Sequence, residues 1–328
     1  MGYKERVRNS LYGLAIGDAI SWPAFYHRTY TLPFWTRRLR REIDAAQEDY
    51  QITRFPMPFS LNRPTENLQF GPTDDTEWAA FTAQLLIESE GNLTRDRVYE
   101  KWSQLAKEAE NVRGSISVQG ALRNIQKGAK PPMTGQDNPH YFDDSACSRA
   151  VVIGAAFPGK LENVLELVSF DGEVTNSLDG LWAAQGLAVA VSTACAGGTW
   201  ETAISNSTSV LPSDSWVRRT VLEALAITEN HQGFSAIPYL DMLVNKEYSY
   251  GGAAPEVLAL TLGVTVLAEG DFEKGLLYAL AFPKLGDSLP ALVGALCGAL
   301  TDHAEPAVLD WVLFIQELSG ICLPQLAG

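Results

Sequence analysis

Two adjacent aspartates, each flanked by a threonine, stand just before an apolar stretch of the chain. The segment is Thr73-Asp74-Asp75-Thr76, and the apolar run over 78–87 that follows it predicts a helix. Neighbouring carboxylates repel each other unless a cation or a hydrogen-bond donor offsets their charge, and Mg²⁺ prefers carboxylate, hydroxyl and water oxygens. The segment therefore predicts either a magnesium site or the capped N-terminus of a helix, where Thr and Asp side chains accept hydrogen bonds from free N–H groups.

Two further carboxylates stand far from this segment in the sequence. Asp287-Ser288 precedes a helix of small residues near the C-terminus. Asp18 lies inside an apolar helix near the N-terminus, where an ionised carboxylate needs a partner to offset its desolvation, and we expect its role to be structural. Asp18 and Asp287 can lie near the segment 73–76 only if the tertiary structure brings them together.

Helical periodicity dominates the chain, and alternating strand patterns are nearly absent. Apolar residues recur at spacings of three and four over 4–20, 76–90, 94–108, 117–127, 145–156, 160–168, 177–197, 199–208, 214–227, 235–246, 253–268, 271–280, 288–300 and 306–318. The sequence predicts an all-α protein, a compact orthogonal multi-helix bundle with the acidic residues at helix ends.

Pairs of glycines four residues apart mark two of these helices. Gly13 and Gly17 lie on the first, and Gly294 and Gly298 lie on the helix over 288–300. Glycines on one helix face let a neighbouring backbone approach closely, so we expect these two helices to cross near the centre.

Composition predicts a single domain over 1–328, with an aromatic and basic insertion at about 22–70. The chain is 46% hydrophobic and has no linker-like stretch. The net charge of −14 disfavours nucleic acid as a partner, because nucleic-acid binders need a basic surface. No apolar run is long enough to span a bilayer, and the N-terminus lacks a signal-peptide pattern, so we expect a cytoplasmic protein without a membrane partner.

The acidic segments together resemble the ADP-ribosylglycohydrolase family over nearly the whole chain. The residues that carry the resemblance are Gly17-Asp18, the segment 73–76 and Gly286-Asp287-Ser288. The resemblance implies a fold of that type and a hydrolase that cleaves the anomeric bond of an ADP-ribosyl conjugate. Its partner would then be an ADP-ribose-type small molecule or an ADP-ribosylated protein.

The same resemblance implies a magnesium centre. The ligands that it assigns are Thr73, Asp74, Asp75, Asp287 and Ser288, and the carboxylates among them are assigned to catalysis. Mg²⁺ would bind ribose hydroxyls and lower the pKa of a water, while one of these aspartates takes the proton. Carboxylates would also stabilise the positive charge that develops on the sugar.

Two departures from the family pattern concern this centre. The family's C-terminal motif has two aspartates, and a gapless alignment equates Asp287 with the second and puts Leu285 in place of the first. Phe25 stands where many members carry a glutamate. One ligand carboxylate is absent, so the chain is compatible with one Mg²⁺ ion or with two.

Substrate-binding residues are also implied by the resemblance. Gly114, Ser115 and Ser117 lie where the family receives the diphosphate, although a serine before a helix is commonly an N-cap. Phe142 lies near an aromatic that stacks on adenine, and Asn176 stands where a histidine is frequent.

Two other functions stay open on the sequence. The missing substrate-side residues and the aromatic insertion are compatible with an N-ribosyl hydrolase of a small nucleoside. The losses at Leu285 and Phe25 are compatible with a non-catalytic relative that binds ADP-ribose or has a structural role.

Overall fold

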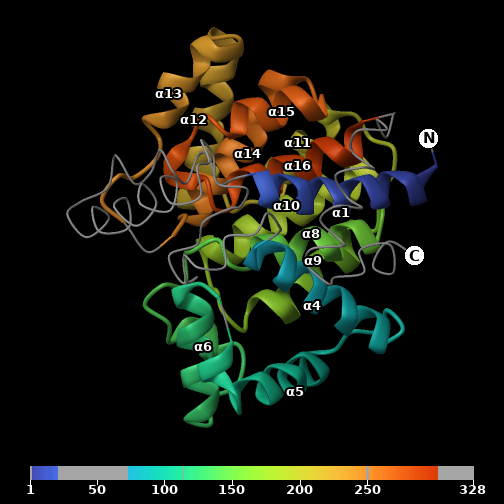
Figure 1. The fold of residues 1–328 in the computed structure, drawn as a ribbon, viewed down its shortest axis with the longest axis vertical. Helices are drawn as coiled ribbons and strands as arrows, with labels where there is room; N and C mark the ends of the chain where they lie inside the picture. The colour runs from blue at the N-terminus through green and yellow to red at the C-terminus, as the bar shows by residue number, and fades with distance from the viewer. Residues whose placement is uncertain (1, 21–72, 113, 249–250, 302–328) are drawn as a thin grey trace, which may run out of the picture.

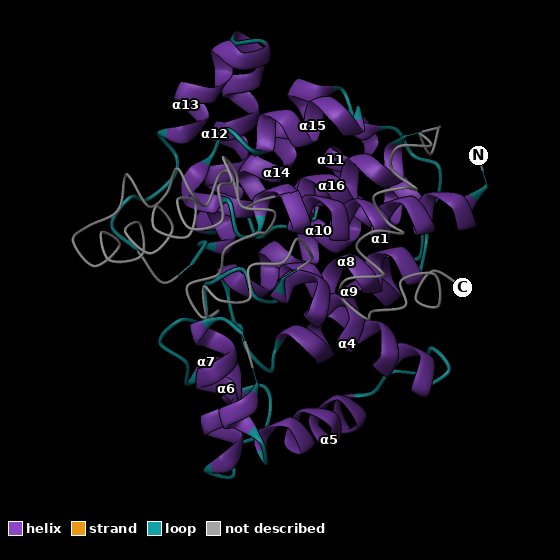
Figure 2. Ribbon diagram, in the orientation of Figure 1, coloured by secondary structure: helices purple, strands orange, loops and turns teal. Residues whose placement is uncertain are grey.

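The computed structural model describes residues 2–20, 73–112, 114–248 and 251–301. Figure 2 shows helices joined by loops in this part of the chain; an isolated β-bridge pairs Asp143 with Ala253, and no strand is present among the described residues. The predicted insertion at 22–70, the position of Phe25 and the predicted helix over 306–318 lie outside these ranges. None of the described helices is both long enough and apolar enough to cross a bilayer.

The helices follow the predicted order closely (Figure 1). The α-helices are α1 Tyr3–Ile20, α4 Asp74–Glu88, α5 Arg95–Ala106, α6 Ile116–Gln126, α7 Met133–Gln136, α8 Cys147–Ala156, α9 Leu161–Gly172, α10 Asp179–Cys195, α11 Trp200–Ser209, α12 Trp216–Asn230, α13 Ile237–Asp241, α14 Ala254–Ala268, α15 Phe272–Ala279 and α16 Leu289–Leu300. Short 3₁₀ helices are η2 Ala109–Asn111, η3 Gly233–Ala236 and η4 Pro283–Leu285. The all-α prediction is confirmed.

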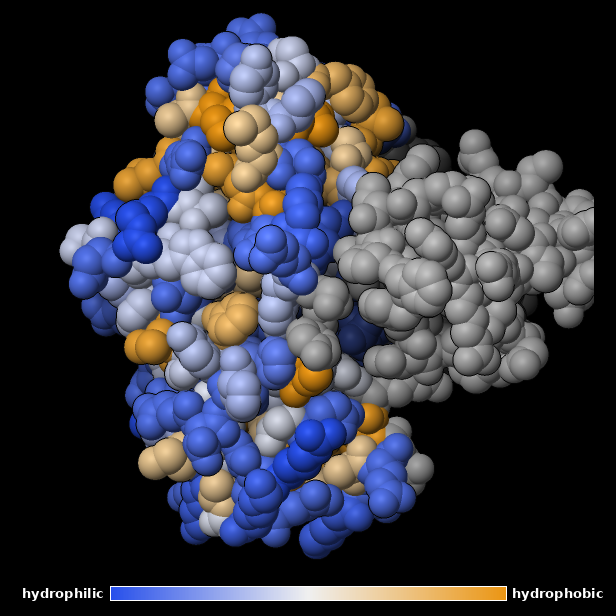
Figure 3. Space-filling view, turned by 90° about the vertical axis from the view of Figure 1, so that its left-hand side faces the viewer, coloured by the Kyte–Doolittle hydropathy of each residue, from blue (hydrophilic) through white to orange (hydrophobic). Residues whose placement is uncertain are grey.

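The core lies where α8, α10, α14 and α16 meet in the middle of the molecule (Figure 1). Every residue of α16 from Leu289 to Ala299 is buried, and nearly all of α14 is buried as well. A helix that is apolar on all sides is stable only when other elements surround it. The amphipathic helices α5, α6 and α12 lie toward the ends of the molecule (Figure 1). Hydrophilic residues predominate over the coloured part of the face shown in Figure 3.

The predicted crossing of the two glycine-bearing helices is present, and it is unusually close. A Cβ atom at Gly13 would lie 2.0 Å from the carbonyl oxygen of Gly294, and a Cβ atom at Gly17 would lie 2.0 Å from that of Pro290. Only hydrogen in place of a side chain permits such contact between backbones. The crossing holds the end of α1, with Asp18, against the start of α16.

Aromatic rings hold α4 to its neighbours. The ring of Trp78 in α4 stacks on that of Trp102 in α5, with centroids 5.0 Å apart, and Phe81 packs edge-on against both. The guanidinium of Arg149 in α8 lies 5.1 Å from the Trp102 ring. Because these rings are large and mostly buried, they fix the position of the α4 N-terminus relative to α8.

Candidate active site

Asp18 caps the N-terminus of α4. Its carboxylate accepts hydrogen bonds from the backbone N–H of Thr73 at 2.6 Å, from the hydroxyl of Thr76 at 2.7 Å and from the backbone N–H of Thr76 at 3.2 Å. The hydroxyl of Thr73 also donates to it. Thr73 occupies the N-cap position but makes no side-chain cap bond within its own helix. The N-terminus of α4 is therefore capped, as one interpretation of the sequence predicted, but the capping side chain is that of Asp18, which lies far away in the sequence.

Burial raises the pKa of Asp18 to about 6, although the bonds from both threonines act in the opposite direction. Since these four hydrogen bonds occupy the carboxylate, Asp18 has the structural role that we expected. It also fixes the first turn of α4, which carries Asp74 and Asp75.

Asp75 faces other acidic side chains across the start of α4. Burial raises its pKa well above the ordinary value, and the negative charges of Asp18, Asp74 and Asp144 raise it further. A hydrogen bond with Ser148 of α8 acts against this shift. The half-buried Asp75 carboxylate thus lies among neighbours of its own charge.

Asp144, just before α8, is a further buried carboxylate of this site. It is only 7% exposed, and its Oδ2 atom is buried without a hydrogen-bond partner. Burial raises its pKa to about 7, the charges of Asp143 and Asp287 add to the shift, and a hydrogen bond with Ser288 lowers it. Gly252 lies against this carboxylate, because a Cβ atom there would be 2.3 Å from Oδ2.

Asp144 connects the two acidic segments that are far apart in the sequence. It acts electrostatically on Asp75 from the first segment, and it interacts with Asp287 and Ser288 from the second. Asp287 and Ser288 are both partly exposed at the start of α16. Asp75 of the first segment and Asp287 and Ser288 of the second therefore all lie within interaction range of the Asp144 carboxylate.

The position that lacks the family aspartate lies in the core. Leu285 ends η4 and is only 1% exposed. Within residues 2–20, 73–112, 114–248 and 251–301, no group of three or more histidine, cysteine, aspartate or glutamate side chains is placed so that it could hold a metal ion.

The N-terminus of α6 receives a carboxylate from within the protein. Asp143 accepts hydrogen bonds from the Ser117 hydroxyl at 2.6 Å and from the Ser117 backbone N–H at 3.2 Å. The Ser115 hydroxyl caps the same helix by accepting from the N–H of Val118. Gly114 allows the chain to pass closely, since a Cβ atom there would lie 2.8 Å from a Val118 methyl carbon. Ser115 is thus the N-cap that is common at such positions, and Ser117 binds Asp143.

Asn176 is fully buried and links the loop that carries the acidic residues to the core. Its amide nitrogen donates to the carbonyl oxygens of Tyr141 at 3.0 Å and Asp143 at 2.7 Å. Its amide oxygen accepts from the hydroxyls of Ser145 at 2.9 Å and Thr175 at 2.6 Å. These bonds use the hydrogen-bonding capacity of the side chain, so Asn176 positions the backbone beside Asp144.

Phe142 belongs to an aromatic cluster next to the acidic loop. Its ring centroid lies 5.2 Å from that of Tyr248, 5.5 Å from that of Tyr141 and 6.1 Å from that of Trp216. His140 shares a hydrogen bond of 2.9 Å with the hydroxyl of Tyr248. These rings form a platform one residue away from Asp143 and two from Asp144.

Arg149 is a buried structural residue. Its Nε atom lies 2.6 Å from a carboxylate oxygen of Asp171, and its other nitrogens donate to the carbonyl oxygen of Ser145 and the hydroxyl of Thr175. Both members of the ion pair are almost inaccessible. This pair anchors α8 to α9.

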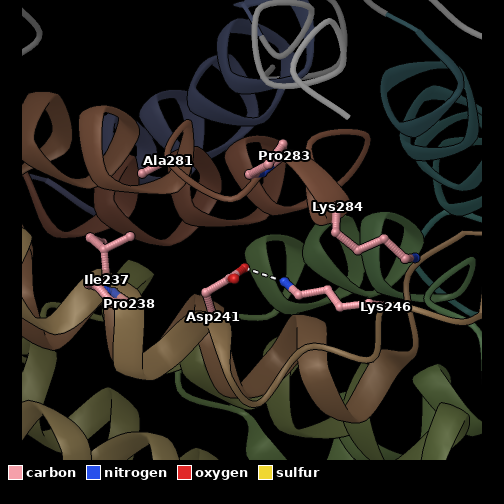
Figure 4. A pocket seen from close by; sticks show the side chains of 7 residues that line it. All are labelled: Ile237, Pro238, Asp241, Lys246, Ala281, Pro283 and Lys284. Atoms are coloured by element: carbon pink, nitrogen blue, oxygen red, sulfur yellow. Dashed lines mark hydrogen bonds and ion pairs between the residues drawn. The ribbon is translucent and has the colours of Figure 1, made fainter. Parts of the chain in front are cut away.

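A separate hollow of about 420 Å³ lies between α13 and the segment before α16 (Figure 4). An ion pair of 2.5 Å joins Asp241 and Lys246 at this hollow. Lys284 also lines it and donates to the carbonyl oxygen of Gly251 at 2.7 Å. The apolar residues that line it are Ile237, Pro238, Ala281 and Pro283. Its charged groups already have partners, so the acidic site remains the better candidate for chemistry.

Sequence reasoning did not assign functions to Asp143, Asp144 or Ser148. A signal for the first two exists, because they form a second pair of adjacent aspartates just before a helix, as Asp74 and Asp75 do. The sequence could not distinguish which member of this pair is bound within the protein and which faces the other carboxylates.

The fold and the site define an all-α protein whose carboxylates gather where several helices begin or end. The family model described as ADP-ribosylglycohydrolase matches residues 1–313, and the chain belongs to this family of glycosyl-bond hydrolases.

A solved structure described as "ADP-ribosylglycohydrolase-related protein complex" is similar, with a TM-score of 0.64 and 20% sequence identity. The match covers 99% of this chain and 96% of that chain, and it confirms the fold. The comparison with curated proteins gave no match.

Proposed function

We propose that this protein is a magnesium-dependent glycoside hydrolase that cleaves the anomeric bond of an ADP-ribosyl conjugate. The observation that carries the proposal is that Asp144 interacts electrostatically with Asp75 and also with Asp287, in a chain that belongs to a family of glycosyl hydrolases. The charges that raise the pKa values of Asp75 and Asp144 belong to other carboxylates. Carboxylates held together in this way are stabilised by a cation, and a cation also suits the chemistry of the family.

The oxygen atoms available at the site are of the kind that Mg²⁺ binds, and they fit an ion that takes only a few ligands from the protein. Asp74, Asp75 and Asp287 supply carboxylate oxygens, and Thr73 and Ser288 supply hydroxyls. The unpartnered Oδ2 atom of the neighbouring Asp144 supports a cation at this site, because the oxygen accepts no hydrogen bond within the described residues. Mg²⁺ commonly binds one or two carboxylates and keeps several waters. Binding through one or two carboxylates and several waters agrees with acidic side chains that, in the described part of the chain, lie near one another but do not form a cluster of three around a single point.

The chemistry follows from the charges around the site. When bound, Mg²⁺ lowers the pKa of a water and orients the hydroxyls of a ribose. Asp74, Asp75 or Asp287 accepts the proton of the attacking water, because all three side chains lie at helix starts that border the site. The same carboxylates stabilise the positive charge that develops at the anomeric carbon.

Substrate recognition is proposed for residues on one side of the site. Phe142 and its aromatic neighbours offer a surface for a base, since aromatic rings stack on planar groups. Gly114 and Ser115 border the N-terminus of α6, where the helix dipole favours a phosphate. Ser117 and Asn176 act by holding Asp143 and the adjacent loop in place.

Release of ADP-ribose from a peptide modified on arginine or serine tests this function. We expect release to depend on Mg²⁺, to stop on addition of a chelator and to be lost in Asp74→Ala and Asp75→Asn. Asp241→Asn, in the ion pair of the separate hollow, is the matched control and should retain activity. Ribose release from free nucleosides without ADP-ribose release would indicate the nucleoside hydrolase instead. Inactivity on both substrates, together with no thermal shift by ADP-ribose, would refute hydrolysis altogether.

A further inference from the structure

We propose that Asp144 is a metal-binding carboxylate of this site and takes the place of the aspartate that the chain lacks at Leu285. This inference rests on the proposed function, because it assigns a further residue to the same magnesium site. It concerns how this particular chain completes a site whose C-terminal motif has lost one acid.

The backbone around Asp144 is held in place from two directions. Its N–H donates to the carbonyl oxygen of Gly252 at 3.2 Å, and its carbonyl oxygen accepts from the N–H of Cys147 at 2.8 Å. The N–H of Ala254 donates to the carbonyl oxygen of Phe142 at 2.9 Å, which extends the contact between the two loops. The Asp144 carboxylate is therefore presented from a fixed backbone, as a preorganised ligand would be.

One oxygen of this carboxylate has no role within the described protein. Oδ2 is buried and lacks a hydrogen-bond partner, and the side chain is more than nine-tenths buried. A buried polar atom without a partner is unfavourable by about 1 to 3 kcal/mol and is rare in folded proteins. The absence of a side chain at Gly252 provides the room that this oxygen occupies. The missing hydrogen-bond partner is explained if Oδ2 binds a cation.

Asp144 also has the correct position to replace the lost acid. Ser288 interacts with it through a hydrogen bond, the charge of Asp287 acts on it, and its own charge acts on Asp75. Leu285 is three residues before Ser288, and its side chain is buried in the core. One carboxylate is missing from the C-terminal segment, and one is added from the start of α8. The negative charge around the site is thus maintained.

Asp143 shows that proximity alone does not make a ligand. Both of its oxygens accept hydrogen bonds, from the backbone and hydroxyl of Ser117 and from the N–H of Ser145 at 3.2 Å. Asp143 and Asp144 are adjacent and buried, yet only Asp144 retains an oxygen without a partner. Asp143 therefore provides a matched control.

Calorimetric titration with MgCl₂, and with MnCl₂ as a second probe, tests the inference without any substrate. The wild-type protein should bind the ion, and Asp144→Asn should weaken binding by about tenfold or more, as is usual for disrupted metal sites. Asp143→Asn should change affinity much less. Circular dichroism and the melting temperature in chelator verify that each variant is folded.

A second variant leaves every carboxylate in place. Gly252→Ala puts a Cβ atom where it would be 2.3 Å from Oδ2 of Asp144, so the carboxylate has to move. We expect a loss of Mg²⁺ affinity similar to that of Asp144→Asn.

Wild-type affinity in both Asp144→Asn and Gly252→Ala, with loss in Asp75→Asn, would overturn the role of Asp144 and leave the proposed function intact. Failure of the wild-type protein to bind either ion would overturn both.

Discussion

The crossing of α1 and α16 should tolerate no side chain at Gly17, and Gly17→Ala measures this directly. The added Cβ would lie 2.0 Å from the carbonyl oxygen of Pro290, whereas Cβ atoms in proteins essentially never come within 3.0 Å of such an atom. The helices would have to separate locally by about 1 Å to relieve this contact. The obstructing atom is backbone, so no side-chain rotation relieves the contact.

Gly263→Ala in α14 is the matched control. Gly263 is also a buried glycine inside a helix, but a Cβ there would make ordinary contacts of 3.5 Å with Leu240 and 3.6 Å with Ala224. Replacing glycine by alanine within a helix contributes up to about 1 kcal/mol of stability by propensity, and this gain applies to both variants. Overpacking costs about 1 to 3 kcal/mol. We therefore expect Gly17→Ala to be less stable than Gly263→Ala by about 1 to 3 kcal/mol.

Urea unfolding at equilibrium gives the comparison. The midpoint should fall for Gly17→Ala and rise or stay constant for Gly263→Ala, with similar slopes in all three proteins. Because Gly17 precedes Asp18 and contacts the start of α16, Mg²⁺ affinity should fall in the first variant alone. Equal stability of the two variants would show that the close crossing is not a feature of the protein and would contradict the packing of the end of α1 against the start of α16.

Three further predictions concern buried charges. Asp18→Ala should lower the free energy of unfolding by about 2 to 4 kcal/mol in urea titrations, because it leaves the donors of Thr73 and Thr76 without their acceptor; an unchanged midpoint would contradict the capping role. Arg149→Met should cost about 3 to 5 kcal/mol, because Asp171 would remain buried without its partner, and the additional change Asp171→Leu should restore part of the loss. In chelator, the free energy of unfolding should fall as pH rises from about 4 to about 7. Burial raises the pKa values of Asp18 and Asp144 in the folded protein to about 6 and about 7, above the ordinary value of 3.8. The native state therefore binds more protons than the unfolded state in that pH range, and raising the pH removes this stabilisation. In melting curves, Asp144→Asn should make the stability depend less on pH, and Mg²⁺ should reduce the loss of stability in the wild-type protein. A stability that rises from about pH 4 to about pH 7 would contradict the raised pKa values of Asp18 and Asp144.

Local sequence was sufficient for most of the helices. The expected helix over 253–268 is α14, Ala254–Ala268, and the expected helix over 94–108 is α5, Arg95–Ala106. Periodic apolar residues set which face of a helix is buried, and capping residues such as Thr94 set where it begins.

The segment over 235–246 was predicted as one helix, and the structure differs. It covers the end of η3, Gly233–Ala236, and the short α13, Ile237–Asp241. Met242, directly after α13, is 80% exposed, so no packing supports a longer helix there. Periodicity describes what a segment can bury, whereas the neighbouring elements decide whether a surface is available.

The sequence by itself determined that this chain is helical, that two glycine-bearing helices cross and that aspartates stand at helix ends. These properties depend on residues close in sequence, which helical geometry relates directly. Only the tertiary structure decided that Asp18 caps α4, that Asp143 binds the start of α6 and that Asp144 faces both Asp75 and Ser288. Hydrogen bonding and charge interaction act over a few ångströms of space, and residues separated by tens of positions reach that distance only after the helices have packed.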